Sequence, residues 1–215
     1  YEVFDSTRKV ARLPGPPYHF MSRVSKINGP IGVCQPGAEI ELEYDIPERV
    51  WYFDQNGCPS MPFAVLLEAA LQPCGWLASF VGSARTTDLD LYFRNLDGTA
   101  TWHRELTPGC GSLRTQVKIT NVSMSGGMII QSFKVVCLLG DERVYTMDTV
   151  FGFFPKVALE NQIGLPSSPE QKALLTDAAP ISVDLRRRPA RFCAAEPRLP
   201  GPMLLMLDRV GIWDE

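Results

Sequence analysis

Residues 60–82 read SMPFAVLLEAALQPCGWLASFVG and form the most apolar long stretch of the chain. A helix drawn through them is apolar nearly all round, which predicts a buried helix rather than a surface helix. Ser60 is expected to cap the first turn, where Pro62 costs little because no N–H is needed there. Gly82 is expected just past the end. Pro73 falls inside the helix and is expected to kink it.

Two polar side chains interrupt this apolar stretch. Glu68 and Gln72 are four residues apart, so they share one face of the helix. A carboxylate on a buried face is costly unless it is paired. The pair therefore has two interpretations: Gln72 satisfies Glu68 in a polar gap of the core, or the two belong to a functional site. Together with Pro73 they also break the apolar run, so no membrane span is expected.

The segments on both sides of the helix are predicted to be strands. Residues 38–45 alternate, with Ile40, Leu42 and Tyr44 on one face. Four β-branched and aromatic runs follow the helix, and glycine turns separate the last three, so we expect a long antiparallel meander. The four runs are residues 89–95, 113–122, 128–138 and 143–154. An apolar sheet face must cover a partner, which predicts an α+β fold with one antiparallel sheet wrapped around a central helix of about residues 60–82.

An internal repeat indicates how the chain is divided. Residues 12–24 read RLPGPPYHFMSRV and residues 198–210 read RLPGPMLLMLDRV, with seven of 13 positions identical at an offset of 198 − 12 = 186. A repeat of this length indicates a domain rather than a solenoid unit. A coincidence of two proline–glycine loops is the alternative. We predict a domain over 1–155, a linker over 156–197 and the start of a second similar domain over 198–215, all cut from a longer multidomain protein.

The predicted linker carries two local features. Ser168, Pro169 and Glu170 are expected to open a short helix. A basic run follows, and its plain interpretation is a solvated surface, whereas the alternative is a docking site for an acidic protein. The run consists of Arg186, Arg187, Arg188 and Arg191.

The overall composition excludes several classes of protein. Lys and Arg number 21 against 24 Asp and Glu, a net charge of −3, so a general nucleic-acid binder is not expected. The six cysteines form no CxxC pair and only two histidines are present, so no metal site is predicted. The chain is apolar enough to fold without disulfides, so we expect free thiols and a cytoplasmic protein. The cysteines are Cys34, Cys58, Cys74, Cys110, Cys137 and Cys193.

The segment before the helix completes a recognisable pattern. Residues 53–62 read FDQNGCPSMP, and Glu68-x-x-x-Gln72 follows. This resembles the hot-dog dehydratases, whose pattern is His-x-x-x-Gly-x-x-x-x-Pro, then Asp or Glu, and Gln or His four residues later. They include the β-hydroxydecanoyl carrier-protein dehydratase and the dehydratase regions of polyketide and polyunsaturated fatty acid synthases, the last looking most similar. The resemblance covers about residues 12–155 and begins again at residue 198.

The resemblance implies a reaction and a set of roles. A dehydratase of this family eliminates water from a 3-hydroxyacyl group carried on the phosphopantetheine of an acyl carrier protein, with no metal or redox cofactor. Glu68 would protonate the leaving hydroxyl and Gln72 would hold Glu68. The backbone N–H groups of Phe63 or Ala64 would bind the thioester oxygen. Gly57 and Pro62 match the family pattern and are expected to belong to the substrate-binding segment.

The sequence departs from the family at two positions. Phe53 stands where the family carries its catalytic His, and Phe63 stands where it has Gly. The resemblance implies that hot-dog domains pair and build each site from both, so a second hot-dog domain or a second copy is expected to supply the base. The two histidines present, His19 and His103, lie outside the motif and are expected to be structural.

Three functions therefore remain open. The first is a dehydratase, or the acid half of one, within a polyunsaturated fatty acid or polyketide-type synthase. The second is a non-catalytic hot-dog domain that completes the pair and shapes the acyl tunnel, for which Phe53 and Phe63 argue. The third is a hot-dog thioesterase, against which the position of Gln72 argues mildly.

Overall fold

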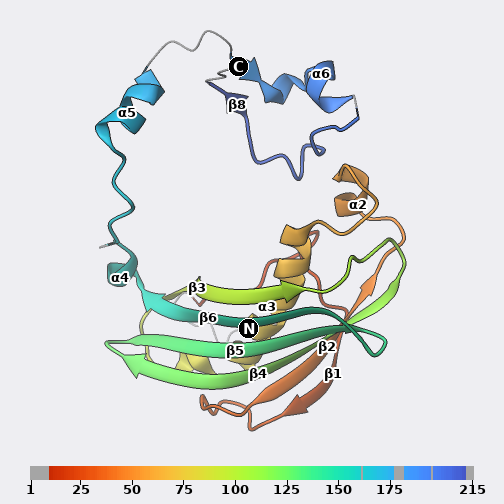
Figure 1. The fold of residues 1–215 in the computed structure, drawn as a ribbon. Helices are drawn as coiled ribbons and strands as arrows, with labels where there is room; N and C mark the ends of the chain where they lie inside the picture. The colour runs from red at the N-terminus through yellow and green to blue at the C-terminus, as the bar shows by residue number, and fades with distance from the viewer. Residues whose placement is uncertain (1–9, 161, 177–181, 195, 212–215) are drawn as a thin grey trace.

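A computed structural model describes residues 10–160, 162–176, 182–194 and 196–211. Its main body is a six-stranded antiparallel sheet with one long helix lying against it (Figure 1). The predicted α+β class, a single sheet around a central helix, is therefore confirmed. The strands are β1 (Arg23–Asn28), β2 (Glu39–Ile46), β3 (Leu91–Trp102), β4 (Gly111–Ser125), β5 (Met128–Leu139) and β6 (Glu142–Pro155).

The strand order is β1-β2-β4-β5-β6-β3. Strands β4, β5 and β6 follow one another through tight turns, as predicted, and Gly126, Gly127 and Gly140 in those turns have the positive φ angles that favour glycine. The predicted meander is wrong for β3, which pairs with β6 instead of β4 and occupies an edge of the sheet. That pairing joins segments about fifty residues apart, so no local pattern specifies it.

Strand β3 is also longer than predicted. It runs to Trp102 instead of ending near Asn95, because its pairing with β6 continues through a bulge between Asn95 and Asp97. Every residue from Phe93 onward in this strand is exposed. Because neither face of this part of the strand is buried, its sequence does not show the alternation of apolar and polar residues that predicts a strand.

The central helix, α3 (Phe63–Phe80), begins three residues later than predicted. Its N-cap is Pro62, with no side-chain cap, so the expected capping by Ser60 is wrong. The reason lies in Met61, because the residue before a proline disfavours helical geometry. At the other end the prediction holds, since Gly82 follows the last turn with φ 73°.

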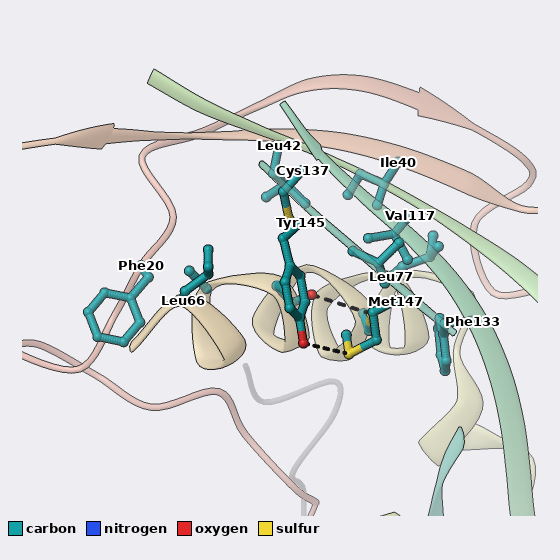
Figure 2. Packing of buried hydrophobic residues seen from close by; sticks show 14 of the residues in the cluster. Phe20, Ile40, Leu42, Leu66, Leu77, Val117, Phe133, Cys137, Tyr145 and Met147 are labelled. Carbon is teal, nitrogen blue, oxygen red and sulfur yellow. Dashed lines mark hydrogen bonds between the residues drawn. The ribbon is translucent and has the colours of Figure 1, made fainter. Parts of the chain in front are cut away.

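The core lies between α3 and the sheet. Leu66 and Leu77 of the helix are buried against side chains from β2, β4, β5 and β6 (Figure 2). Burying each large apolar side chain contributes about 1.5–3 kcal/mol. Cys74 and Cys137 are buried in the same core, and burial raises the pKa of Cys137 to about 12, so these thiols pack as apolar groups. The labelled sheet residues are Ile40, Leu42, Val117, Phe133, Cys137, Tyr145 and Met147.

The segment Phe63–Arg85 is long and apolar enough, by length and composition alone, to cross a membrane. Of its most apolar window, 61% is buried inside the protein. The sheet that covers α3 therefore accounts for the apolar character of this helix.

Short elements flank the sheet. The first two are α2 (Trp51–Gln55), which was not predicted, and η1 (Ser83–Arg85). After the sheet come α4 (Lys156–Glu160), α5 (Pro169–Thr176), β7 (Val183–Asp184), η2 (Leu185–Arg187), α6 (Ala190–Cys193) and β8 (Arg209–Val210). The part from α5 to β8 lies away from the sheet (Figure 1), and residues 198–203 contact the end of α2 and the loop after it.

Helix α5 is the short helix expected in the linker. Its start is a reciprocal capping box, in which the N–H of Gln171 donates to Ser168 Oγ at 3.2 Å and the N–H of Ser168 donates to Gln171 Oε1 at 2.8 Å.

In the basic run, Arg186 and Arg187 both pair with Asp184, at 3.0 and 3.6 Å. The division of the chain at residues 155 and 197 stays a prediction.

Candidate active site

Glu68 and Gln72 lie together on one face of α3, as their spacing predicts. Gln72 Nε2 donates to Glu68 Oε1 at 3.0 Å. Gln72 is only 2% exposed, whereas Glu68 is half-buried. The amide is therefore locked in the protein while the carboxylate reaches the edge of a cavity.

Two backbone groups far away in the sequence fix the orientation of Gln72. Its Oε1 accepts the N–H of Phe20 at 2.8 Å, and its Nε2 donates to the carbonyl of Tyr18 at 2.7 Å. Because Oε1 already accepts a backbone N–H, the amide must present its N–H side to Glu68. Glu68 Oε1 is thus held as an acceptor, and Oε2 is the carboxylate oxygen that Gln72 does not contact.

Tyr18 adds an aromatic side chain beside the carboxylate. Its ring stacks on Trp51, with centroids 6.0 Å apart, and meets Phe20 edge-on at 5.0 Å. Partial burial raises the pKa of the Tyr18 phenol, and the charge of Glu68 raises it further. The hydroxyl therefore keeps its proton at neutral pH.

Glu68 and Gln72 line a cavity of about 270 Å³. The rest of the lining is mostly apolar, so the cavity suits a hydrocarbon chain with a polar reacting group at the carboxylate. The lining residues come from three parts of the chain: Leu71, Gly75 and Ser79 of α3; Phe93, Asn95, Phe151 and Phe153 of β3 and β6; and Ala11, Arg12, Leu13 and Pro14 of the N-terminal segment.

A larger hollow of about 710 Å³ lies over β1, β2, β4 and β5. Its lining includes paired surface charges such as Glu39 and Lys118, 2.6 Å apart. Neither Glu68 nor Gln72 reaches it, so the smaller cavity is the candidate active site.

The other predicted site residues are not in this cavity lining. Phe63 and Ala64 form the first turn of α3, and Ala64 lies one turn before Glu68 on the same face. Within the described residues, no partner is shown for their backbone N–H groups, which lie about 6 Å along the axis from Glu68. The Phe63 ring is 47% exposed and lies 6.1 Å from the Trp102 ring.

Gly57 and Pro62 occupy the loop between α2 and α3. Pro62 is the N-cap of α3 and does not face the cavity. Gly57 is exposed, and a Cβ added there would lie 3.4 Å from the carbonyl oxygen of Arg198. The structure thus places Gly57 against the second repeat, away from Glu68.

Phe53, at the position of the family histidine, belongs to an aromatic cluster. It is 9% exposed, and its ring centroid lies 4.7 Å from that of Tyr52. Tyr52 is fully buried, with its hydroxyl 3.0 Å from that of Tyr44. The position is packed, so it presents no base to a substrate.

We predict that Phe53→His does not create a working base. A buried imidazole without a partner is expected to lower the free energy of unfolding by about 1–3 kcal/mol. Thermal unfolding and a dehydration assay on the same variant measure the two effects. A higher dehydration rate with unchanged stability would contradict the packing described.

The two histidines lie outside the cavity lining, as expected for structural residues. His19 is exposed, with Nδ1 3.2 Å from the carbonyl oxygen of Pro14. His103 is also exposed, with Nε2 2.9 Å from Thr146 Oγ1. Among the described residues, no three His, Cys, Asp or Glu side chains gather in a group that would hold a metal ion.

The contributors to the site that sequence reasoning missed include Leu13, Tyr18 and Phe20 of the N-terminal segment. All three lie in the repeated segment 12–24, so the repeat was the signal that marks them. It was interpreted only as a domain boundary, because the partners of its backbone are more than fifty residues away.

A long apolar helix covered by one antiparallel sheet, with an acid–amide pair facing a cavity, defines a hot-dog protein. Residues 13–148 match the model of the FabA-like domain. The chain therefore belongs to the FabA-like domain family.

A curated relative is one of the polypeptides of the polyunsaturated fatty acid synthase of Thraustochytrium sp., which is 33% identical over 138 residues. The match covers 62% of this chain and 9% of that polypeptide. The chain thus spans less than a tenth of the relative that it matches.

Solved structures show the same fold. The dehydratase heterocomplex ApeI:P from Xenorhabdus doucetiae matches with a TM-score of 0.51 and 14% identity, over 69% of this chain and 93% of that chain. A thioesterase from Haemophilus influenzae matches with a TM-score of 0.42 and 12% identity, over 63% and 77%. The first similarity supports the hot-dog fold alone, and the second is too loose to support an argument.

Proposed function

We propose that the chain is the acid half of a dehydratase site in a polyunsaturated fatty acid or polyketide-type synthase. The reaction would remove water from a 3-hydroxyacyl thioester and give an enoyl thioester. One observation carries the proposal: the Glu68–Gln72 pair, locked in orientation, lines an apolar cavity in a FabA-like domain.

Glu68 is the acid in this proposal. Its Oε2 carries the proton, because Oε1 is held by Gln72, and it passes that proton to the 3-hydroxyl as the C–O bond breaks. A base removes the proton from the neighbouring carbon, and the electrons of that C–H bond form the double bond. The leaving group departs as water, and the base proton returns to Glu68 before the next cycle.

Besides the acid and the base, the proposed reaction needs a group that binds the thioester oxygen, and the first turn of α3 supplies it. The N–H groups of Phe63 and Ala64 are proposed to bind the thioester oxygen, whose negative charge grows as the carbon is deprotonated. The positive end of the helix dipole favours that charge. The Phe63 ring, where relatives have glycine, narrows the approach to this turn.

The base would come from a second hot-dog domain, because Phe53 is packed and neither histidine lines the cavity. The substrate would arrive on the phosphopantetheine of an acyl carrier protein, and the proposed chemistry uses no further cofactor. Six free cysteines fit a cytoplasmic location.

The buried Phe53 favours a second candidate, a non-catalytic domain that only completes the pair and shapes the tunnel. Product analysis separates these functions. A longer polypeptide that contains a complete second hot-dog domain is incubated with a 3-hydroxyacyl thioester and the products are identified by mass spectrometry. An enoyl thioester supports the dehydratase, a free acid indicates a thioesterase, and an enoyl product that does not depend on Glu68 indicates the non-catalytic role.

A further inference from the structure

The second copy of the repeat is docked on the loop that follows α2. We call residues 55–57 the motif loop. Gly201 donates its N–H to the carbonyl of Gln55 at 2.6 Å, and Arg198 Nη2 donates to the carbonyl of Asn56 at 2.8 Å. The segment RLPGP therefore recognises the backbone of a motif loop.

The glycine in this segment allows the motif loop to approach closely. A Cβ added to Gly201 would lie 1.9 Å from Gln55 Oε1 and 3.2 Å from Gln55 Cα. The φ angle of Gly201 is not in the left-handed region, so the close approach of the motif loop, and not backbone strain, explains the glycine.

Gly15 is the same glycine in the first copy, but the described residues give no reason for it. A Cβ added there would meet no described atom within 4 Å, and its φ is also outside the left-handed region. Its five-residue context, RLPGP, is nevertheless identical to that of Gly201. Gly201 is therefore covered by a motif loop, whereas the equivalent surface at Gly15 is not covered by any of the described residues.

We infer that residues 12–17 are the docking surface for the motif loop of a second hot-dog domain. In this contact the N–H of Gly15 donates to a backbone carbonyl of that loop, as the N–H of Gly201 does to Gln55. The inference rests on the proposed pairing with a second domain. A second copy of this chain does not fit as the occupant, because its own motif loop is already covered by its residues 198–203.

The surface is held in place at both ends. Leu13 packs on α3, where a Cβ added to Gly75 would lie 2.8 Å from Leu13 Cδ2. At the other end, the backbone groups of Tyr18 and Phe20 form hydrogen bonds with the side chain of Gln72. The segment therefore needs no ordering when a loop docks, which lowers the cost of binding.

The position of this surface has a consequence for the reaction. Residues 11–14 line the cavity that contains Glu68, so a loop docked on residues 12–17 lies at its mouth. In the family pattern the histidine precedes the glycine of the motif loop by four residues. Docking on the segment around Gly15 would thus bring the base of the second domain beside Glu68.

Hydrogen exchange measured by mass spectrometry tests the contact directly. The amides of Arg12, Leu13, Gly15 and Tyr18 are compared in the 215-residue chain and in a longer polypeptide that contains a complete second hot-dog domain. We expect exchange at least about tenfold slower in the longer protein. Gly15→Val should abolish this protection there and leave the melting temperature of the 215-residue chain unchanged.

Gly164→Val is the matched control, because a Cβ at Gly164 also meets nothing within 4 Å and its φ is ordinary. It should leave the protection intact. Equal exchange of residues 12–18 in both proteins, or full protection in the Gly15→Val variant, would overturn the inference. Exchange is independent of turnover, so protection without any dehydration would reject the proposed function and keep the docking surface.

Discussion

Replacing Glu68 by Gln is expected to lower the dehydration rate of the full-length protein by about 10²–10⁴-fold, the usual contribution of a general acid. The new side chain keeps the shape, and its amide oxygen can still accept the N–H of Gln72. It has no proton to give to the leaving hydroxyl. The half-buried position of Glu68 means that stability should change little.

The measurement is a single-turnover assay on a 3-hydroxyacyl thioester, together with a melting curve. Glu105→Gln is the matched control, since Glu105 is an exposed carboxylate outside the cavity lining. Unchanged turnover in the Glu68 variant would reject the acid role and favour the non-catalytic function.

The second large effect concerns stability. Gln72→Leu leaves the buried N–H of Phe20 and the partly buried carbonyl of Tyr18 without the partner they have in Gln72, at about 1–3 kcal/mol each. The free energy of unfolding should fall by about 2–5 kcal/mol, which corresponds to roughly 4–20 °C in melting temperature. Dehydration should fall as well, because Glu68 loses the group that orients it.

Two further variants separate these effects. Gln35→Leu changes an exposed glutamine and should stay within about 0.5 kcal/mol of the parent chain. Gln72→Glu keeps the volume but places a second carboxylate beside Glu68, so it should also lose stability at neutral pH. A melting temperature for Gln72→Leu equal to that of the parent would show that the two hydrogen bonds from Gln72 to Tyr18 and Phe20 do not anchor the N-terminal segment.

The sequence predicted those parts of the fold that neighbouring residues determine. Apolar composition indicated α3, and glycine turns indicated the β4–β5–β6 hairpins. The four-residue spacing of Glu68 and Gln72 predicted their bond. In each case the interacting groups are close along the chain, so their pattern is visible in a short window.

The parts that were missed depend on distant partners. Strand β3 joins β6 across the intervening β4 and β5, and Gln72 is fixed by the backbone of Tyr18 and Phe20. A backbone N–H or carbonyl carries no sequence signal, because every residue except proline has both. The predicted start of α3 was wrong for a reason that neighbouring residues do contain. Serine is a favoured N-cap residue, so Ser60 was predicted to cap the helix, whereas Pro62 keeps Met61 out of helical geometry.

The position of β3 at the edge of the sheet has a practical consequence for handling this chain. An open edge strand offers unpaired backbone groups to any other extended chain and is a recognised starting point for aggregation. Here the risk is increased by exposed apolar side chains on the strand, Phe93, Leu96 and Trp102. The bulge near Asp97 shortens the flat stretch and offsets part of that risk. Solubility of the isolated chain therefore depends in part on how well this edge is shielded, separately from how stably the domain folds.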